Sequence, residues 1–164
     1  MPTLTFETTI HAPLAEVWRL HDDPQANLPA LALPGSDAKI ESADVPVREG
    51  SRMVILARGP AGKSIRWVAK IVEHRPPHAV VFGEEARFVN EQESGPFAYW
   101  RHEHEFESLD SKTTRLVDRV TYRVGMGPLG WIADWLLVRW RIIAMFRHRH
   151  RVTRQRLEAA AKSA

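Results

Sequence analysis

The sequence predicts an α+β protein in which a curved antiparallel sheet of about seven strands is covered by one long C-terminal helix. Two observations carry this prediction. Apolar residues alternate with polar residues through much of the first 124 positions, which is typical of half-buried strands. After Gly125, Gly127 and Pro128 the pattern becomes helical up to about Ala161, which corresponds to roughly 45–50 Å of helix.

Composition predicts a single domain covering residues 1–164. The chain is 44% hydrophobic and 26% charged, which is ordinary globular usage and excludes a disordered or fibrous protein. It contains no cysteine, so a disulfide framework and thiolate chemistry are excluded. The first ten residues alternate instead of forming a basic segment followed by an apolar one, which argues against a signal peptide. These features predict a cytoplasmic protein.

Two short helices are expected after the first strand. Leu4, Phe6, Thr8 and Ile10 alternate with polar residues and predict that strand. Pro13 suits the first turn of a helix, which Asp22, Asp23 and Pro24 end. A brief helical segment is then expected from Gln25 to Leu33, because Pro29 and Pro34 do not favour a longer one.

The middle of the chain, residues 36–124, predicts an antiparallel meander broken at residues such as Pro46, Gly50 and Pro76. Phe88 to Pro96 is the longest stretch without a clear pattern. We expect it to be a loop, and a loop of this length beside a cavity would serve as a lid.

The long helix divides into two halves of different character. Leu129 to Phe146 is apolar on most of its circumference and is therefore expected to be buried, with Leu136 and Trp140 facing the sheet. Asp134, Arg139 and Arg141 lie within this half, and central charges of this kind argue against a membrane span.

Two consecutive strands place polar residues on the inner face of the sheet. Trp100, His102, His104 and Phe106 share one face of their strand, and Leu116, Asp118, Val120 and Tyr122 share one face of the next. If the three residues 110–112 form the loop between them, His104 lies opposite Asp118 and Trp100 lies opposite Tyr122.

The predicted pair of His104 and Asp118 allows three interpretations. It is an internal hydrogen bond, a polar anchor for a ligand, or a general acid/base pair in which the carboxylate orients the imidazole. His102 and His104 also have the spacing of two metal ligands on one strand, with Asp118 as a third. The sequence suggests no further metal ligand, so we expect no metal. It also contains no cofactor motif, so we expect no organic cofactor.

The order of elements resembles the START-like superfamily, whose helix-grip fold is shared by lipid-transfer domains and by polyketide cyclases or dehydrases. The resemblance covers nearly the whole chain and is closest to a bacterial ligand-binding subgroup. The segments that carry it most specifically are Gly95-Pro96-Phe97, Trp100-Arg101-His102-Glu103-His104-Glu105-Phe106, Leu116-Val117-Asp118 with Tyr122, and Gly127-Pro128-Leu129-Gly130. Members share a cavity more reliably than a reaction, so the resemblance implies ligand binding.

The leading hypothesis is therefore a carrier or sensor that binds a hydrophobic or aromatic small molecule, lipid-like or polyketide-like, in an internal cavity. The residues expected to line it are Trp67, Trp100, His102, His104, Asp118, Tyr122, Leu136 and Trp140.

Two other functions remain open. One is a cyclase or dehydratase that needs neither metal nor organic cofactor and uses His104 and Asp118 for proton transfer. The other is an interaction module whose arginine-rich segment, Arg147 to Arg156, contacts anionic lipid, RNA or a ribosome. No DNA partner is expected, and arginine runs of this kind more often form a solvated helix end than a binding surface.

Overall fold

The computed structural model describes residues 1–59, 62–78 and 82–163, and its architecture matches the fold class expected from the sequence. One antiparallel sheet has the strand order β1-β7-β6-β5-β4-β3-β2. Its strands are β1 (Thr3–Ile10), β2 (Lys39–Ala43), β3 (Arg52–Arg58), β4 (Ser64–Arg75), β5 (Glu85–Ser94), β6 (Tyr99–Asp110) and β7 (Thr113–Arg123).

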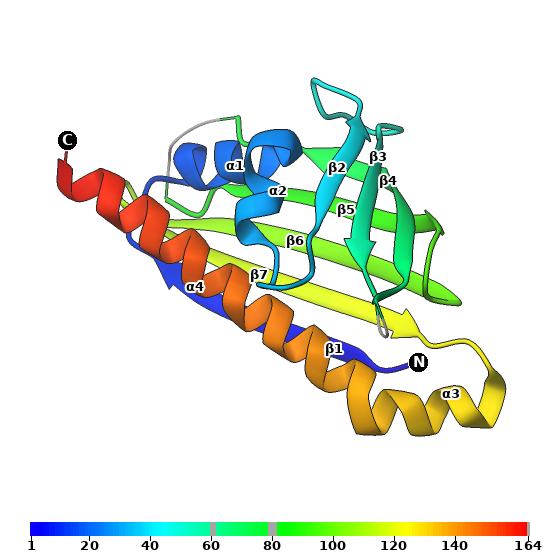
Figure 1. Cartoon of the computed structure of the whole chain (residues 1–164). Coiled ribbons are helices and arrows are strands. Elements are labelled where there is room, and N and C mark those ends of the chain that lie inside the picture. Colours follow the sequence, from blue (N-terminus) through cyan, green and yellow to red (C-terminus); the bar gives the residue numbers. More distant parts are fainter. Residues whose placement is uncertain (60–61, 79–81, 164) are drawn as a thin grey trace.

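The helices cover one face of this curved sheet. Figure 1 shows α1 (Leu14–Asp22) and α2 (Pro24–Leu31) at one end, while the C-terminal helix crosses the face alongside β1 and β7. That helix is continuous but is assigned in three parts: α3 (Gly127–Ala133), the π-helical turn η2 (Asp134–Val138) and α4 (Arg139–Ser163). The two short helices and the long helix therefore lie where the sequence predicted them.

The prediction of a loop from Phe88 to Pro96 is wrong. Residues up to Ser94 belong to β5, which pairs with β4 on one side and β6 on the other. The apolar pattern is faint here because two register shifts interrupt the pairing with β4, and each shift changes which side chains face inward. A short turn at residues 95–98 remains, so β5 provides no long lid.

The register between β6 and β7 is the predicted one. Trp100 pairs with Tyr122 and His104 pairs with Asp118. The loop differs from the expected three residues, because Asp110 already pairs with Thr113 and the register shifts between Ser108 and Asp110. A two-residue turn and a one-residue bulge add up to the same offset, so the inner face is preserved.

The interior contains two hydrophobic clusters. One lies under α1 and includes Ile10, Trp18, Phe88, Phe106, Leu116 and Leu157. The other lies nearer the start of α4 and includes Leu4, Trp100, Val120, Tyr122, Ile142 and Phe146. Each of β6, β7 and α4 contributes to both clusters, and each carries a polar residue between its two contributions.

The outer face of the sheet carries a lattice of ion pairs instead. Arg87 contacts Glu103 and Glu105 at 2.8 Å, and Arg119 contacts the same two carboxylates. These side chains are partly exposed to solvent, and ion pairs at a protein surface typically contribute only about 0–1 kcal/mol each. They identify the solvent side of the sheet, and they leave the concave side as the place for a functional site.

Candidate functional site

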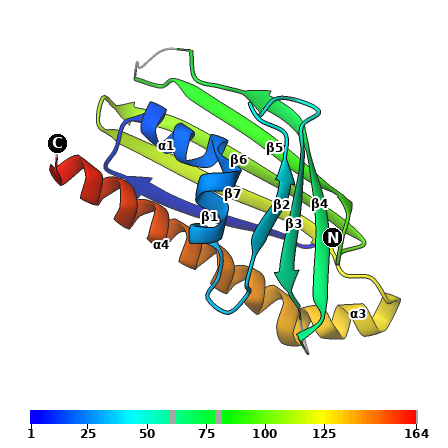
Figure 2. The ribbon, with the colours of Figure 1, turned by 45° about the horizontal axis from the view of Figure 1, so that its top comes forward.

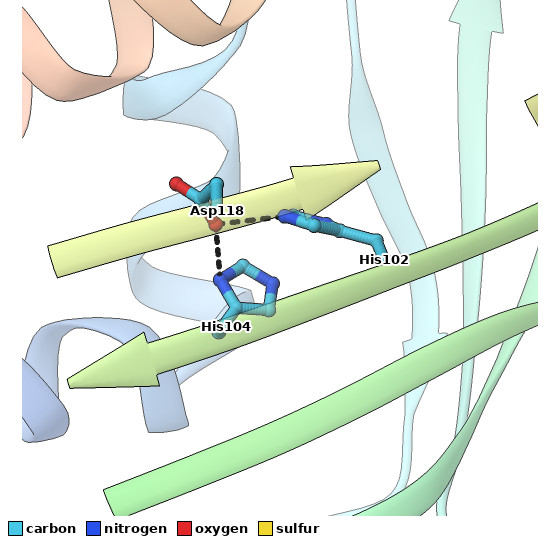
Figure 3. Close-up of side chains that lie close together, drawn as sticks. All are labelled: His102, His104 and Asp118. Carbon is cyan, nitrogen blue, oxygen red and sulfur yellow. Dashed lines mark hydrogen bonds and ion pairs between the residues drawn. The ribbon is translucent and has the colours of Figure 1, made fainter. Parts of the chain in front are cut away.

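The polar residues between the two hydrophobic clusters form a buried layer, which we call the Asp118 layer: His102 and His104 from β6, Asp118 from β7 and His150 from α4. Their exposed fractions are 4%, 4%, 0% and 7%. Figure 3 shows the two β6 histidines directed toward the Asp118 carboxylate. The alternation of β6 and β7 places them there, because every second residue of these strands faces the helix.

Three imidazoles surround one carboxylate. His102 Nε2 donates to Asp118 Oδ1 over 2.7 Å, and His150 Nε2 donates to Oδ2 over 2.6 Å. His104 Nδ1 lies 2.8 Å from Oδ1, but its direction does not meet hydrogen-bond geometry, so this buried nitrogen has no hydrogen-bond partner among the described residues. His104 is therefore the least satisfied member of the layer and the one best able to bond to another molecule.

The charges of this layer follow from burial and mutual contact. Burial alone would raise the pKa of Asp118, but the facing imidazoles outweigh it and hold that pKa well below its usual range. Burial also lowers the pKa of His102, and together with the neighbouring His102 it lowers that of His104 well below its usual range. At neutral pH His102 and His104 are thus uncharged beside the Asp118 carboxylate.

A fourth histidine stands beside the layer. The His21 ring lies 6.0 Å from the His104 ring, and its Nδ1 donates to the carbonyl oxygen of Val17 over 2.8 Å. Its Nε2 is buried and has no hydrogen-bond partner in the described part of the chain. Burial lowers the pKa of His21 to about 4, so this ring also stays uncharged at neutral pH.

An aromatic wall adjoins the layer on the side of Trp100. It consists of Trp67, Phe97, Trp100 and Tyr122, whose ring centroids are 4.8–6.3 Å apart. Trp100 and Tyr122 are buried, whereas Trp67 and Phe97 are partly exposed. The buried Nε1 of Trp67 lacks a hydrogen-bond partner among described residues, which adds a second free donor to this interior.

Six of the eight predicted lining residues therefore face the interior together: Trp67, Trp100, His102, His104, Asp118 and Tyr122. Their side chains pack against one another. Two clefts in the described part of the chain are lined by none of these six residues, although one of them includes His150. One, of about 240 Å³, lies on the outer face near Arg87 and Arg115, and the other, of about 280 Å³, lies between Phe6 on β1 and Arg147, Arg151 and Arg154 on α4.

Leu136 and Trp140 do not face the sheet, and this part of the prediction is wrong. Each is 61% exposed, and neighbouring apolar residues from Leu129 onward are exposed too. The residues of this part of the helix that pack in the second hydrophobic cluster include Val138, Ile142 and Phe146. Leu136 and Trp140 each lie two residues from Val138 and therefore point to the other side of the helix, while α3 extends past the end of the sheet (Figure 1).

Sequence reasoning missed His150. This residue of the C-terminal helix was not connected to Asp118. A usable signal existed, because the buried residues of α4 up to position 160 follow one another at steps of three and four: Ile142, Phe146, His150, Thr153 and Leu157. A histidine within such a stripe points to a polar group on the facing sheet.

A metal would need the donors of this layer to move apart. Ligand atoms of His102, His104 and Asp118 all lie within 4.8 Å of one another, and two histidines with a carboxylate suit a divalent first-row metal. Tetrahedral zinc with bonds of about 2.0–2.1 Å separates its ligand atoms by more than about 3 Å. The nitrogen–oxygen distances of 2.7 and 2.8 Å are shorter, so these groups here contact each other directly.

Comparison with known proteins identifies the fold. A family model described as a domain of unknown function (DUF8410) matches residues 77–157. None of the curated proteins matches the chain in sequence.

Solved structures are similar over almost the whole chain. A START superfamily protein from Mycobacterium smegmatis has a TM-score of 0.66 at 13% identity, covering 96% of this chain and 98% of that one. The Zhui aromatase/cyclase from Streptomyces sp. R1128 has a TM-score of 0.63 at 16% identity, with 97% of both chains covered. Norcoclaurine synthase from Thalictrum flavum, in complex with a transition state analogue, has a TM-score of 0.59 at 15% identity, with 93% of both chains covered. The chain thus has the helix-grip fold of START-like proteins and polyketide cyclases.

Proposed function

We propose that this protein is a carrier or sensor that binds a hydrophobic or aromatic small molecule between its sheet and α4. The observation that carries the proposal is the Asp118 layer, a buried carboxylate with three imidazoles placed between two apolar clusters. Ligand sites in proteins have this composition, with apolar walls and a few convergent polar groups.

A buried layer of this kind is not expected to add much to the stability of the folded protein. Removing a carboxylate from water costs several kcal/mol even when it is paired, and well-packed apolar residues in the same volume are often equally stable or more so. A buried charged layer in the interior of a ligand-binding fold is therefore better explained by a role in binding or catalysis than by a contribution to folding stability.

The arrangement of free polar atoms indicates the chemistry of the ligand. His104 has no well-directed bond to Asp118, and Trp67 Nε1 has no hydrogen-bond partner in the described chain, so two polar groups are available. The Trp100 ring contacts those of Trp67, Phe97 and His102, so aromatic surface adjoins both polar groups. This combination fits a molecule with a planar apolar body and a hydroxyl or carbonyl group directed at His104.

The ligand would enter by displacing side chains at the partly exposed end of the aromatic wall. Trp67 and Phe97 are only half-buried there. The side chain of Gln92 holds the turn before β6, because its Nε2 donates to the Phe97 carbonyl over 2.7 Å and its Oε1 accepts from the Phe97 N–H over 3.2 Å. Entry is thus expected to involve side chains more than the backbone of this turn.

Native mass spectrometry of the freshly purified protein tests the proposal, with released small molecules identified after denaturation. A stoichiometric apolar or aromatic adduct is expected, and Trp67→Ala and His104→Ala should both reduce it. His148→Ala provides the matched control, because His148 is remote from Asp118 and contacts Arg151 instead. An adduct that persists unchanged in the Trp67 and His104 variants would place the ligand elsewhere.

The second candidate function is a cyclase or dehydratase. The observation in its favour is the orientation of His104: when Nδ1 carries the proton facing Asp118, Nε2 is unprotonated and available as a base. His104→Ala should then retain ligand affinity and lose turnover. Equal loss of affinity and turnover would favour simple anchoring.

The arginine-rich end of α4 supports a third candidate, an anionic contact. Arg147, Arg151 and Arg154 are exposed and line the open cleft beside Phe6 and His150. Contacts of this kind with RNA, a ribosome or anionic lipid weaken steeply with salt, whereas binding of an apolar ligand does not. The salt dependence of binding therefore separates this candidate from the first.

A further inference from the structure

The segment from Met126 to Trp140 has an exposed apolar surface that the proposed small-molecule site does not use. Eight of its side chains are at least 47% exposed: Met126, Leu129, Trp131, Ile132, Trp135, Leu136, Leu137 and Trp140. Three of the six tryptophans of the chain belong to this set. Scattered exposed apolar residues are normal, but a contiguous group of this size marks a contact surface.

The π turn helps to gather these side chains. The Arg139 N–H bonds to the carbonyl oxygen of Asp134, a spacing of five residues instead of the four of an α-helix. This wider turn brings Trp135 and Trp140 closer to one side of the helix than an α turn would. Trp131 and Trp135 already lie one α turn apart, so the three indoles follow one another along the helix.

A bond to the sheet holds the turn in place. The Tyr122 hydroxyl, on β7, donates to Asp134 Oδ1 over 2.7 Å. Figures 1 and 2 both show α3 at the edge of the molecule, beyond the end of the sheet. The exposed surface is therefore anchored from below and free to meet a flat partner.

We propose that the face of α3, η2 and the first turn of α4 that carries Trp131, Trp135 and Trp140 docks on the surface of an anionic lipid bilayer. The charges around it favour this occupant. From Arg123 to Arg147 the chain has four arginines and a single carboxylate, Asp134, which already accepts the Tyr122 hydroxyl. Arg123, Arg139, Arg141 and Arg147 are all exposed. Indoles flanked by arginines are the side chains that settle at the boundary between lipid headgroups and acyl chains.

A second copy of the chain is a less suitable occupant. A two-fold contact across this face would bring Arg139 and Arg141 of both copies together, and the one nearby carboxylate is already engaged by Tyr122. An anionic bilayer neutralises the same arginines. The segment would lie on the bilayer, since no helix in the described part of the chain is long and apolar enough to cross it.

Vesicle binding by the full-length protein tests this proposal. Vesicles of phosphatidylglycerol and phosphatidylcholine in equal amounts should bind the protein and shift its tryptophan emission to the blue, while phosphatidylcholine vesicles should bind it far more weakly. The triple variant Trp131→Ala/Trp135→Ala/Trp140→Ala should lose at least about tenfold in affinity for the anionic vesicles. The double variant Arg139→Gln/Arg141→Gln should also lose about tenfold or more, because each arginine near an anionic surface contributes on the order of 1 kcal/mol.

Phe82→Ala is the matched control, because Phe82 is 83% exposed in the turn before β5, at the other end of the sheet, and its loss should leave vesicle binding unchanged. Circular dichroism confirms that each variant is folded. Absence of binding to anionic vesicles by the folded wild-type protein would overturn the proposal, and so would full binding by the triple tryptophan variant. A dimer in analytical ultracentrifugation that this variant abolishes would assign the face to a second copy. Loss of binding in Arg151→Gln/Arg154→Gln alone would move the contact to the end of α4.

Discussion

His150 on α4 and Asp118 on β7 are joined by a hydrogen bond of 2.6 Å between Nε2 and Oδ2, and both side chains are buried. The bond connects the C-terminal helix to the interior of the sheet. It also occupies the Asp118 oxygen that the β6 histidines leave free.

His150→Ala should destabilise the protein by about 2–3 kcal/mol, because it removes a donor from a buried carboxylate. Urea denaturation followed by circular dichroism measures this change. His148→Ala, two residues away on the more exposed side, should stay within about 0.5 kcal/mol of the wild type. Equal effects of the two substitutions would show that the bond to Asp118 contributes little.

Stability should fall as pH decreases below about 6.5, the ordinary pKa of histidine. The pKa values of His21, His102 and His104 are lowered in the folded protein, so the unfolded chain binds protons first as pH falls. Each such group removes up to about 1.4 kcal/mol per pH unit until its folded pKa is reached. The lowered pKa of Asp118 acts in the same direction, but only below about pH 3.9.

Thermal unfolding at pH 7.5, 6 and 5 checks this dependence. The melting temperature should decrease between the two lower pH values, and His21→Gln should make the decrease shallower, since its folded pKa of about 4 makes it a contributor over this whole range. A melting temperature that is constant from pH 7.5 to pH 5 would contradict the uncharged state of the buried imidazoles.

Tyr122→Phe should loosen α3 and η2 more than the rest of the molecule. Burial and the Asp134 carboxylate raise the pKa of Tyr122, so the hydroxyl stays protonated and donates to Asp134. The substitution removes one charge-assisted bond, at a cost of about 1.5–3 kcal/mol. Hydrogen exchange measured by mass spectrometry should accelerate in residues 127–140. Tyr99→Phe, at the start of β6, is the control, and the same acceleration there would argue against a tether.

Gly130→Ala should destabilise the junction between β7 and the C-terminal helix. A Cβ atom at Gly130 would lie 1.7 Å from the carbonyl oxygen of Gly125 and 3.3 Å from that of Val124, so the backbone would have to move. Such overpacking typically costs about 1–3 kcal/mol. Leu129→Ala, at a residue that is 70% exposed, should have little effect in the same urea titration. Similar stability of the two variants would mean that the junction adapts freely.

Local patterns were sufficient for much of the fold and for three of the four residues of the Asp118 layer. Alternation identified the inner face of β6 and β7, and a single consistent offset then paired His104 with Asp118 and Trp100 with Tyr122. The predicted register of β6 and β7 was correct although the predicted loop length was not, because hydrophobic matching along the strands constrains the register more strongly than the turn does. The strand β5 was missed because its register shifts break the alternation that reveals a strand.

The sequence by itself determined which strand faces are apolar, where the helices begin and that a histidine faces a carboxylate, since these properties depend on residues a few positions apart. Only the tertiary structure decided which residue bonds to the second carboxylate oxygen of Asp118. His150 reaches Asp118 across 32 residues because α4 crosses β7 at that level. Leu136 and Trp140 remain exposed because Val138 and Ile142 are the residues that pack on the sheet at this level. Both outcomes depend on how the C-terminal helix lies on the sheet, and the periodicity within either element does not contain that information.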